Sequence, residues 1–178
     1  APPQRRSPGA MLRVHGGPEY GAVPGVTGAI GLATGLLWPR ARLEVHGLYL
    51  APRTTTAGAN ALRLSLFSGA VLGCGRLGRG AFELPLCGGL ELGGVRSTAT
   101  GPGARSGFDI WVAGALTAGI AWHVARRLSL TAALHGLVHL YGPRYELGDP
   151  GEGEALFRAA PVSGRLLFGL ELRLGDRW

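Results

Sequence analysis

The chain has 178 residues, of which 32 are glycine, 12 are proline and only 16% are charged. This composition disfavours long exposed helices, because glycine and proline are the weakest helix formers, and a hydrophobic content of 46% is too high for a disordered chain. The net charge of +7 comes from 18 arginines without any lysine. Because these arginines are scattered rather than clustered with aromatic residues, nucleic-acid binding is not expected.

The first ten residues are polar and rich in proline. They contain no apolar segment of the kind that forms the core of a signal peptide, so we expect no signal peptide in this numbering. If the protein is exported, we expect these residues to belong to its mature form. The length fits one domain, and no linker inside the chain marks a second. We therefore expect a flexible N-terminal segment over residues 1–10 and one domain over residues 11–178.

Eight segments of this domain alternate between large apolar residues and small or polar residues. Alternation with a period of two predicts β-strands with two unlike faces. In chain order the segments are Met11–Gly16, Val26–Trp38, Leu43–Tyr49, Ala61–Gly73, Leu84–Gly93, Ile110–Trp122, Leu128–Tyr141 and Arg165–Leu174. The last is the clearest, because its leucines oppose Glu171 and Arg173. The fold class expected is all-β.

Two stretches without charge, Gly21–Trp38 and Ile110–Ala125, also resemble short transmembrane helices. Gly31 and Gly35 in the first have a spacing that packs helices together in membranes. A helical hairpin is therefore the rival interpretation. Both stretches also fit strands with large residues on one face and small residues on the other, with Trp111 as the exception, and the rest of the chain has period two.

The connections between the eight segments alternate in length. Pro39–Arg42, Arg76–Phe82 and His123–Arg127 are short, whereas the other connections are longer and carry the glycine, proline and threonine residues of mobile loops. Short turns at one end and long loops at the other are typical of an up-and-down membrane barrel. A sheet that crosses lipid must also close on itself, because an open edge leaves backbone groups unpaired.

Three of the four tryptophans, Trp38, Trp122 and Trp178, come at the ends of segments that run toward the short turns. Amphipathic aromatic rings favour the interface between lipid and water, so these residues predict an aromatic girdle at one rim. Scattered core aromatics are the alternative. Together these features predict an eight-stranded antiparallel up-and-down transmembrane β-barrel.

The end of the chain carries a family resemblance. Alternating apolar residues from Phe168 to Leu174 precede a final aromatic residue, Trp178, although Asp176 interrupts the row. On this pattern the chain resembles the eight-stranded outer-membrane barrels of Gram-negative bacteria, of the OmpA transmembrane-domain and OmpX type. The resemblance covers nearly the whole chain. It implies short turns and both termini in the periplasm, long loops at the cell surface, contact with outer-membrane lipid, and recognition of the last strand by the barrel-assembly machinery.

The polar rows of the strands would face the barrel interior. Charges of both signs there predict a hydrogen-bonded ionic plug, since a buried charge without a partner is costly. The expected lumen residues are Arg13, His15, Glu44, His46, Arg63, Glu91, Asp109, His135, His139, Arg165, Glu171 and Arg173.

An enzyme site in the lumen or at its rim is the rival interpretation of these polar residues. No spacing of serine and histidine typical of barrel enzymes is visible. His135 and His139 would lie about 13 Å apart along a strand, too far to share a metal ion. We therefore expect no catalytic site, no metal and no cofactor.

Cys74 and Cys87 flank a predicted hairpin. A turn centred on Gly80 and Ala81 would place the two cysteines directly opposite each other, which favours a cross-strand disulfide in an exported protein. The assigned rows conflict with this pairing, because they put Cys74 on the outward face and Cys87 on the inward face. A bulge or one wrongly assigned row is then required. Two reduced, buried thiols are the alternative.

Function is expected to reside in the surface loops. The leading hypothesis is an integral outer-membrane protein, not an enzyme, with a structural, adhesive or partner-binding role. The loop arginines Arg53, Arg96, Arg105 and Arg144 could pair with lipopolysaccharide phosphates or stay solvated. A small channel is the second hypothesis, and a soluble lipocalin-like barrel, with its large apolar row pointing inward, is the third.

Overall fold

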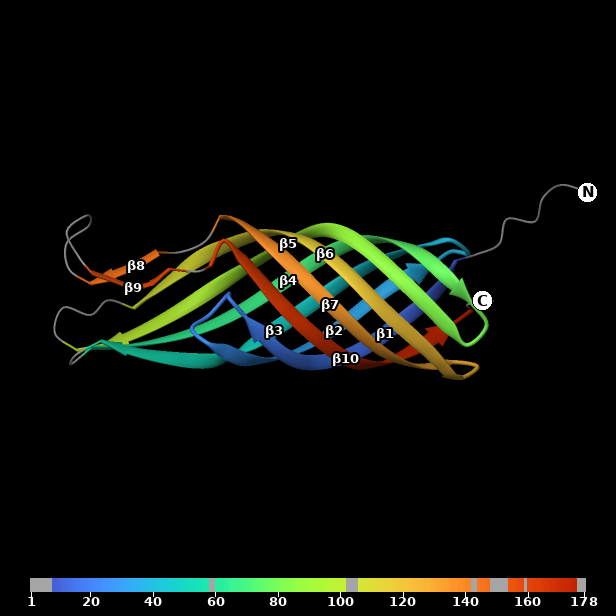
Figure 1. Ribbon diagram of the computed structural model, residues 1–178, viewed down its shortest axis with the longest axis horizontal. Coiled ribbons are helices and arrows are strands. Elements are labelled where there is room, and N and C mark those ends of the chain that lie inside the picture. Colours follow the sequence, from blue (N-terminus) through green and yellow to red (C-terminus); the bar gives the residue numbers. More distant parts are fainter. Residues whose placement is uncertain are drawn as a thin grey trace, which may run out of the picture.

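In the computed structural model the chain forms a closed antiparallel barrel (Figure 1). The described residues are 8–57, 60–101, 106–141, 144–147, 154–158 and 160–175. The barrel strands are β1 (Gly9–Tyr20), β2 (Val26–Leu37), β3 (Ala41–Ala57), β4 (Asn60–Arg79), β5 (Phe82–Thr100), β6 (Gly107–Ala125), β7 (Leu128–Tyr141) and β10 (Val162–Leu174). Their order around the wall is β1-β10-β7-β6-β5-β4-β3-β2. The predicted eight-stranded up-and-down barrel is confirmed.

The two uncharged stretches form strands β2 and β6, so the helical-hairpin interpretation is wrong. None of the described segments is a helix long and apolar enough to cross a bilayer. In both strands large apolar side chains such as Ile30 and Leu116 point outward and are exposed, while Ala33 and Ala113 are buried. The large row therefore faces away from the lumen, opposite to the arrangement in a soluble ligand-binding barrel.

Four neighbouring strands extend the wall at the loop end. β3, β4, β5 and β6 have 17 to 20 residues, whereas β1, β2, β7 and β10 have 12 to 14. Pairing of β3 with β2 reaches only Leu50, and pairing of β6 with β7 reaches only Val112. The remaining parts of β3 to β6 pair with one another and protrude on the left of Figure 1. We call this part the protruding sheet.

The structure differs from expectation in the last long connection and at the start of the first strand. The long connection expected over residues 142–161 contains a separate hairpin, β8 (Arg144–Leu147) with β9 (Glu154–Arg158). Strands of four and five residues are too short to reveal a period in the sequence. The expected flexible segment over residues 1–10 falls mostly on residues 1–7, which lie outside the described residues, and Gly9 already begins β1.

The structure reverses the predicted orientation of β4. Leu62, Leu64 and Leu66 are buried and face the lumen, whereas Arg63 and Phe67 are exposed on the outward face. Both faces of this strand are largely apolar, so the alternation alone cannot say which face is inside, and a shift of one residue exchanges them. The pairing of β4 with β3 and β5 fixes the orientation instead.

Candidate functional site

Glu171 joins three barrel strands near the short-turn end of the lumen. It lies on β10, where alternation turns it inward and away from the exposed leucines on either side. Its Oε2 lies 3.2 Å from Nη1 of Arg13 on β1 and 2.7 Å from Nη2 of Arg42 on β3. Its Oε1 lies 2.6 Å from Nε of Arg173. One carboxylate therefore neutralises guanidinium groups from three strands.

Glu83 has the same role on the opposite wall. It lies at the start of β5 and is fully buried. Its Oε2 lies 2.9 Å from Nη2 of Arg76 on β4 and 2.6 Å from Nη1 of Arg173 on β10. Its Oε1 lies 3.2 Å from Nη1 of Arg42. Arg42 and Arg173 thus bridge Glu83 and Glu171 across the lumen.

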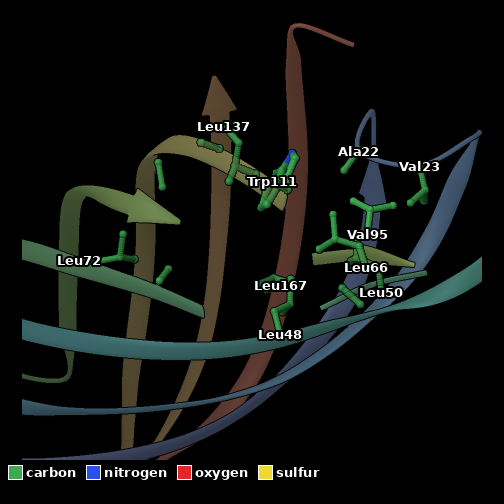
Figure 2. Packing of buried hydrophobic residues seen from close by; sticks show 14 of the residues in the cluster. Ala22, Val23, Leu48, Leu50, Leu66, Leu72, Val95, Trp111, Leu137 and Leu167 are labelled. Atoms are coloured by element: carbon green, nitrogen blue, oxygen red, sulfur yellow. The ribbon is translucent and has the colours of Figure 1, made fainter. Parts of the chain in front are cut away.

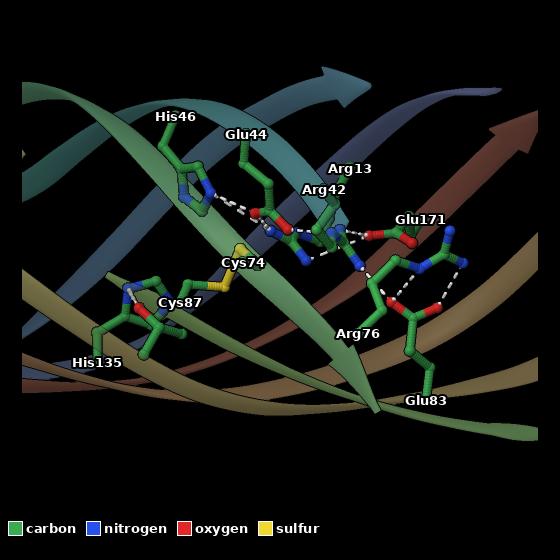
Figure 3. The surroundings of a disulfide bond; sticks show 11 residues. Arg13, Arg42, Glu44, His46, Cys74, Arg76, Glu83, Cys87, His135 and Glu171 are labelled. Carbon is green, nitrogen blue, oxygen red and sulfur yellow. Dashed lines mark hydrogen bonds and ion pairs between the residues drawn. A yellow bond between two sulfur atoms is a disulfide. The ribbon is translucent and has the colours of Figure 1, made fainter. Parts of the chain in front are cut away.

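Glu44 completes this cross-section (Figure 3). It accepts from Arg13 and lies 2.5 Å from Nε of Arg42, and its Oε2 lies 2.6 Å from Nε2 of His46. We call the set the ionic layer, and its members are Arg13, Arg42, Glu44, Arg76, Glu83, Glu171 and Arg173. All seven side chains are buried, so each charge depends on its partners rather than on water.

A second ion pair lies farther toward the loops. Arg165 on β10 donates to both carboxylate oxygens of Glu91 on β5, at 2.9 and 2.8 Å. The hydroxyl of Ser68 also donates to Glu91. The guanidinium carbon of Arg165 lies 5.6 Å from the ring centre of Trp111, within the range of a cation–π contact. This pair marks the transition from the charged to the apolar part of the lumen.

Three imidazole rings occupy the middle of the lumen. The ring centres of His15 and His46 are 5.5 Å apart, and those of His46 and His135 are 5.9 Å apart. His135 Nδ1 lies 3.1 Å from the hydroxyl of Thr117. All three histidines are buried, and they fill the space between β1, β3 and β7.

An apolar layer fills the loop end of the lumen (Figure 2). Its members are Leu48, Leu50, Leu64, Leu66, Val95, Trp111, Leu137 and Leu167, with Ala22 and Val23 of the β1–β2 loop. Glu19 turns this loop inward, because its Oε1 accepts from the backbone N–H of Ala22 at 2.9 Å. Val23 is only 1% exposed, so the loop is part of the packing rather than a mobile flap above it.

Cys74 and Cys87 form a disulfide between β4 and β5. They are direct partners in a ladder that ends at Arg79 and Phe82, so the turn is centred on Gly80 and Ala81. Both cysteines are buried in the lumen beside Glu44 (Figure 3). The predicted outward position of Cys74 is wrong, and so is the predicted inward position of Arg63. The reason is the same for both, because the whole row of β4 is reversed.

The residues named for the lumen network lie in separate groups: Arg13, Glu44, His46, Glu171 and Arg173 meet at the ionic layer, Glu91 pairs with Arg165, and His15 and His135 lie beside His46. Arg63 is the correction, because it is exposed on the outward face of β4. His139 is half-buried and sits apart from the ionic layer, with its Nε2 2.9 Å from the hydroxyl of Ser163 and its ring centre 5.2 Å from that of Trp111. Asp109, also half-buried, has the same parity on β6 as the inward Trp111.

Three members of the ionic layer were not predicted from the sequence. Arg42 and Arg76 fall at positions assigned to short turns, and Glu83 falls between a predicted turn and the strand predicted from Leu84, whereas the strands continue through all three. For Arg42 the signal was present, because it has the same parity as Glu44 and His46. For Arg76 the reversed row of β4 concealed it.

Aromatic residues occur at both rims of the barrel. Trp38 and Trp122 are partly exposed at the short-turn end, and the rings of Trp122 and Phe82 stack with centres 6.2 Å apart. Trp178, the third tryptophan of the predicted girdle, lies outside the described residues, as does Asp176. Tyr20, Tyr49 and Tyr141 are exposed toward the loop end.

The four loop arginines have different surroundings. Arg53 donates to the backbone carbonyl of Val26. Arg96 is exposed on the outward face of β5. Arg105 lies outside the described residues, and so does the side chain of Arg144.

The polar contacts in the lumen include two serine–histidine pairs. His123 Nδ1 lies 2.8 Å from Ser129, and His139 Nε2 lies 2.9 Å from Ser163, yet both serines are buried. In the described ranges, the only grouping with metal-ligand spacing is Glu44 with Cys74 and Cys87, whose sulfur atoms are bonded to each other.

Comparison with known proteins identifies the fold. No family model matches the chain, and no curated protein sequence matches it significantly. A major outer membrane protein of Thermus thermophilus superposes with a TM-score of 0.62 at 13% identity, covering 93% of this chain and 99% of that one. The N-terminal barrel of Pseudomonas aeruginosa OprF gives 0.58 at 11% identity, covering 93% and 97%.

The attachment invasion locus protein Ail of Yersinia pestis gives a TM-score of 0.58 at 10% identity, covering 95% of this chain and 99% of that one. Ail has also been solved in complex with the heparin analogue sucrose octasulfate. At these identities the similarity concerns the fold alone. The chain has the eight-stranded β-barrel fold of bacterial outer-membrane proteins.

Proposed function

We propose that the chain is an integral protein of the bacterial outer membrane that neither conducts ions nor catalyses a reaction, and that presents its loop end to partners outside the cell. The observation that carries this proposal is the protruding sheet above a filled lumen. A strand needs about 9–11 residues to cross a bilayer, whereas β4 has 20. The additional length serves a purpose outside the bilayer.

The outward surface supports membrane insertion. The outward row of β4 from Phe67 to Leu77 carries no charged residue, and neither does that of β5 from Phe82 to Gly94. Soluble proteins rarely expose apolar surface this continuous. In lipid the same surface costs nothing, because the surroundings are equally apolar.

Recognition by the barrel-assembly machinery through the last strand belongs to the same proposal. β10 presents Phe168, Leu170, Leu172 and Leu174 on its outward face, all exposed. This is the alternating pattern on which the resemblance to outer-membrane barrels rests. We also expect the short turns to lie in the periplasm and the protruding sheet at the cell surface.

The filled lumen disfavours the channel hypothesis. Guanidinium and carboxylate groups bridge it at the ionic layer, and close packing fills it at the apolar layer. An ion would have to break several buried ion pairs in the first layer and then cross a dry region in the second.

The protruding sheet supports partner binding. Among the described residues, β3 beyond Leu50 has no ladder partner on β2, and β6 before Val112 has none on β7. Open sheet edges bind additional strands through backbone hydrogen bonds. Because Ail shares this fold and was solved with sucrose octasulfate, that compound is a suitable first probe for a saccharide partner.

Membrane fractionation, heat-modifiable gel mobility and planar-bilayer recording test this proposal together. We expect the protein in the outer-membrane fraction, a mobility shift on boiling and no steady conductance. Recovery in the soluble fraction without a mobility shift would contradict membrane insertion. Steady conductance would instead favour the channel. For the binding role, protein in lipid vesicles is titrated with sucrose octasulfate, and absence of saturable binding would remove sulfated saccharides from the candidate partners.

A further inference from the structure

Two arginines lie side by side on the outward face of the protruding sheet. Arg63 on β4 is directly opposite Thr98 on β5, and Ser65 on β4 is directly opposite Arg96 on β5. The two arginines are therefore diagonal neighbours, with backbones about 7–8 Å apart. A hydroxyl residue faces each arginine across the ladder, and Thr54 on β3 flanks Arg63 on its other side.

Neither arginine has a partner within the described part of the chain. Arg63 and Arg96 are both exposed and make no hydrogen bond or ion pair with a described residue. Among the described residues of the protruding sheet, no carboxylate lies on the outward face. Arg53 differs, because it already donates to a backbone carbonyl. Two adjacent cations without counterions favour an anionic ligand.

The surface beside and below the two arginines is aromatic and then apolar, because Phe108 on β6 is the direct ladder partner of Arg96 and Phe67 lies two residues below Ser65 on β4. Phe67 and Phe108 stack with ring centres 5.9 Å apart. Their rings cover Gly94, where an added Cβ would lie 2.3 Å from Phe108 Cζ. Aromatic residues of membrane barrels lie at the level of the lipid headgroups. Arg96 is two residues farther than Gly94 along β5, about 7 Å along the tilted strand toward the loop end, and so beyond the edge of the hydrocarbon.

We propose that Arg63 and Arg96, together with Thr54, Ser65 and Thr98, bind the phosphate of a lipid headgroup in the leaflet at the loop end. Guanidinium groups bind phosphate oxygens through paired N–H donors, and the hydroxyl groups supply further donors. The acyl chains of the same lipid would lie against the outward leucines of β5 below Gly94. The proposal rests on the membrane insertion proposed above and adds a lipid site to it.

Retention of lipid by purified protein tests this site. Protein in phosphatidylcholine nanodiscs is titrated with bis-phosphorylated lipid A, with dephosphorylated lipid A or with inorganic phosphate, and bound lipid is counted by native mass spectrometry. We expect wild-type protein to retain the phosphorylated lipid. The double variant Arg63→Gln with Arg96→Gln should bind it about tenfold more weakly.

The matched control is Arg126→Gln with Arg127→Gln, which removes the same charge from the β6–β7 turn at the opposite rim. It should bind like wild type. The double variant Arg63→Lys with Arg96→Lys should recover part of the affinity, because the charge returns without the paired donors. Equal retention by wild type and the Gln variant overturns the site, as does equal binding of dephosphorylated lipid. If inorganic phosphate binds as tightly as the phosphorylated lipid, the lipid is overturned as the source of the bound phosphate.

Heat-modifiable mobility of the same samples separates the two proposals. If wild-type protein does not insert into the nanodiscs, membrane insertion itself fails. If wild type and the Gln variant both insert and shift on boiling but retain equal lipid, only the phosphate site fails. Both arginines point outward and contribute nothing to the lumen, so the variant should fold normally.

Discussion

The two ends of the lumen are filled by opposite chemistry. The ionic layer consists of four arginines and three glutamates that share partners between strands. The apolar layer consists of leucines, one valine and one tryptophan packed against an inward loop. Ion pairs are directional and fail together when one partner is removed, whereas apolar packing loses stability in proportion to the volume removed. The same barrel should therefore respond differently to mutation at its two ends.

The largest effect is expected for Glu171→Ala in the ionic layer. This change leaves Arg13, Arg42 and Arg173 without one shared carboxylate in a buried site. We expect a loss of about 3–5 kcal/mol in the free energy of unfolding, measured by urea titration in micelles with heat-modifiable mobility as the readout. Arg126→Ala, an exposed charge at a nearby turn, is the control. An unchanged unfolding midpoint for Glu171→Ala would contradict the shared role.

A smaller effect is expected for Leu64→Ala in the apolar layer. Leu64 is completely buried, and its truncation should cost about 2–4 kcal/mol through lost packing and the cavity left behind. The control is Leu116→Ala on the outward face, where the side chain is 69% exposed and lipid can fill the space. If the two variants lose equal stability, the comparison between lumen and lipid face is wrong.

The disulfide adds a covalent link beside the ionic layer. Cys74 and Cys87 are 13 residues apart, so replacing both with alanine should cost about 2–3 kcal/mol through the freedom gained by the unfolded hairpin. Intact-mass analysis with and without reductant checks the bond itself, because reduction adds two hydrogens. Failure to gain that mass would show that the wild-type thiols are already reduced.

The smallest effect is expected when the Arg165–Glu91 pair is replaced as a whole. Arg165→Leu with Glu91→Leu should change stability by about 1 kcal/mol or less, since buried pairs exchanged for apolar residues are often neutral. Each single replacement should cost more, because it leaves one buried charge alone. A double variant as unstable as the worse single variant would show that this pair, next to Trp111, belongs energetically with the ionic layer.

Much of the fold could be predicted because alternation is strongest where the two faces differ most. In the last strand, the alternation of Glu171 and Arg173 with exposed leucines is enough to predict which face is inside. The strand from Ala61 to Gly73 was ambiguous for a physical reason. It contributes leucines to the apolar layer, so its inward face is as apolar as its outward face, and only pairing with its neighbours decides the orientation.

The site could be predicted only in part, for a related reason. Arg42, Arg76 and Glu83 lie where strand ends look like turns in the sequence, because arginine and glutamate at a chain reversal are normally solvated. Their burial depends on the neighbouring strands that enclose them. Arg63 was predicted to face the lumen because it alternates with leucine. Its outward position, next to Arg96, could be found only from the structure.

The seam between the first and last strands has a further consequence. Arg13 on β1 is the direct ladder partner of Glu171 on β10, although 158 residues separate them in sequence. The two charges can meet only when the sheet has closed on itself. A slip of one residue at this seam would turn one of the two charges toward the lipid. The correct register at this seam therefore pairs the two charges inside the lumen, whereas a register shifted by one residue leaves one of them unpaired.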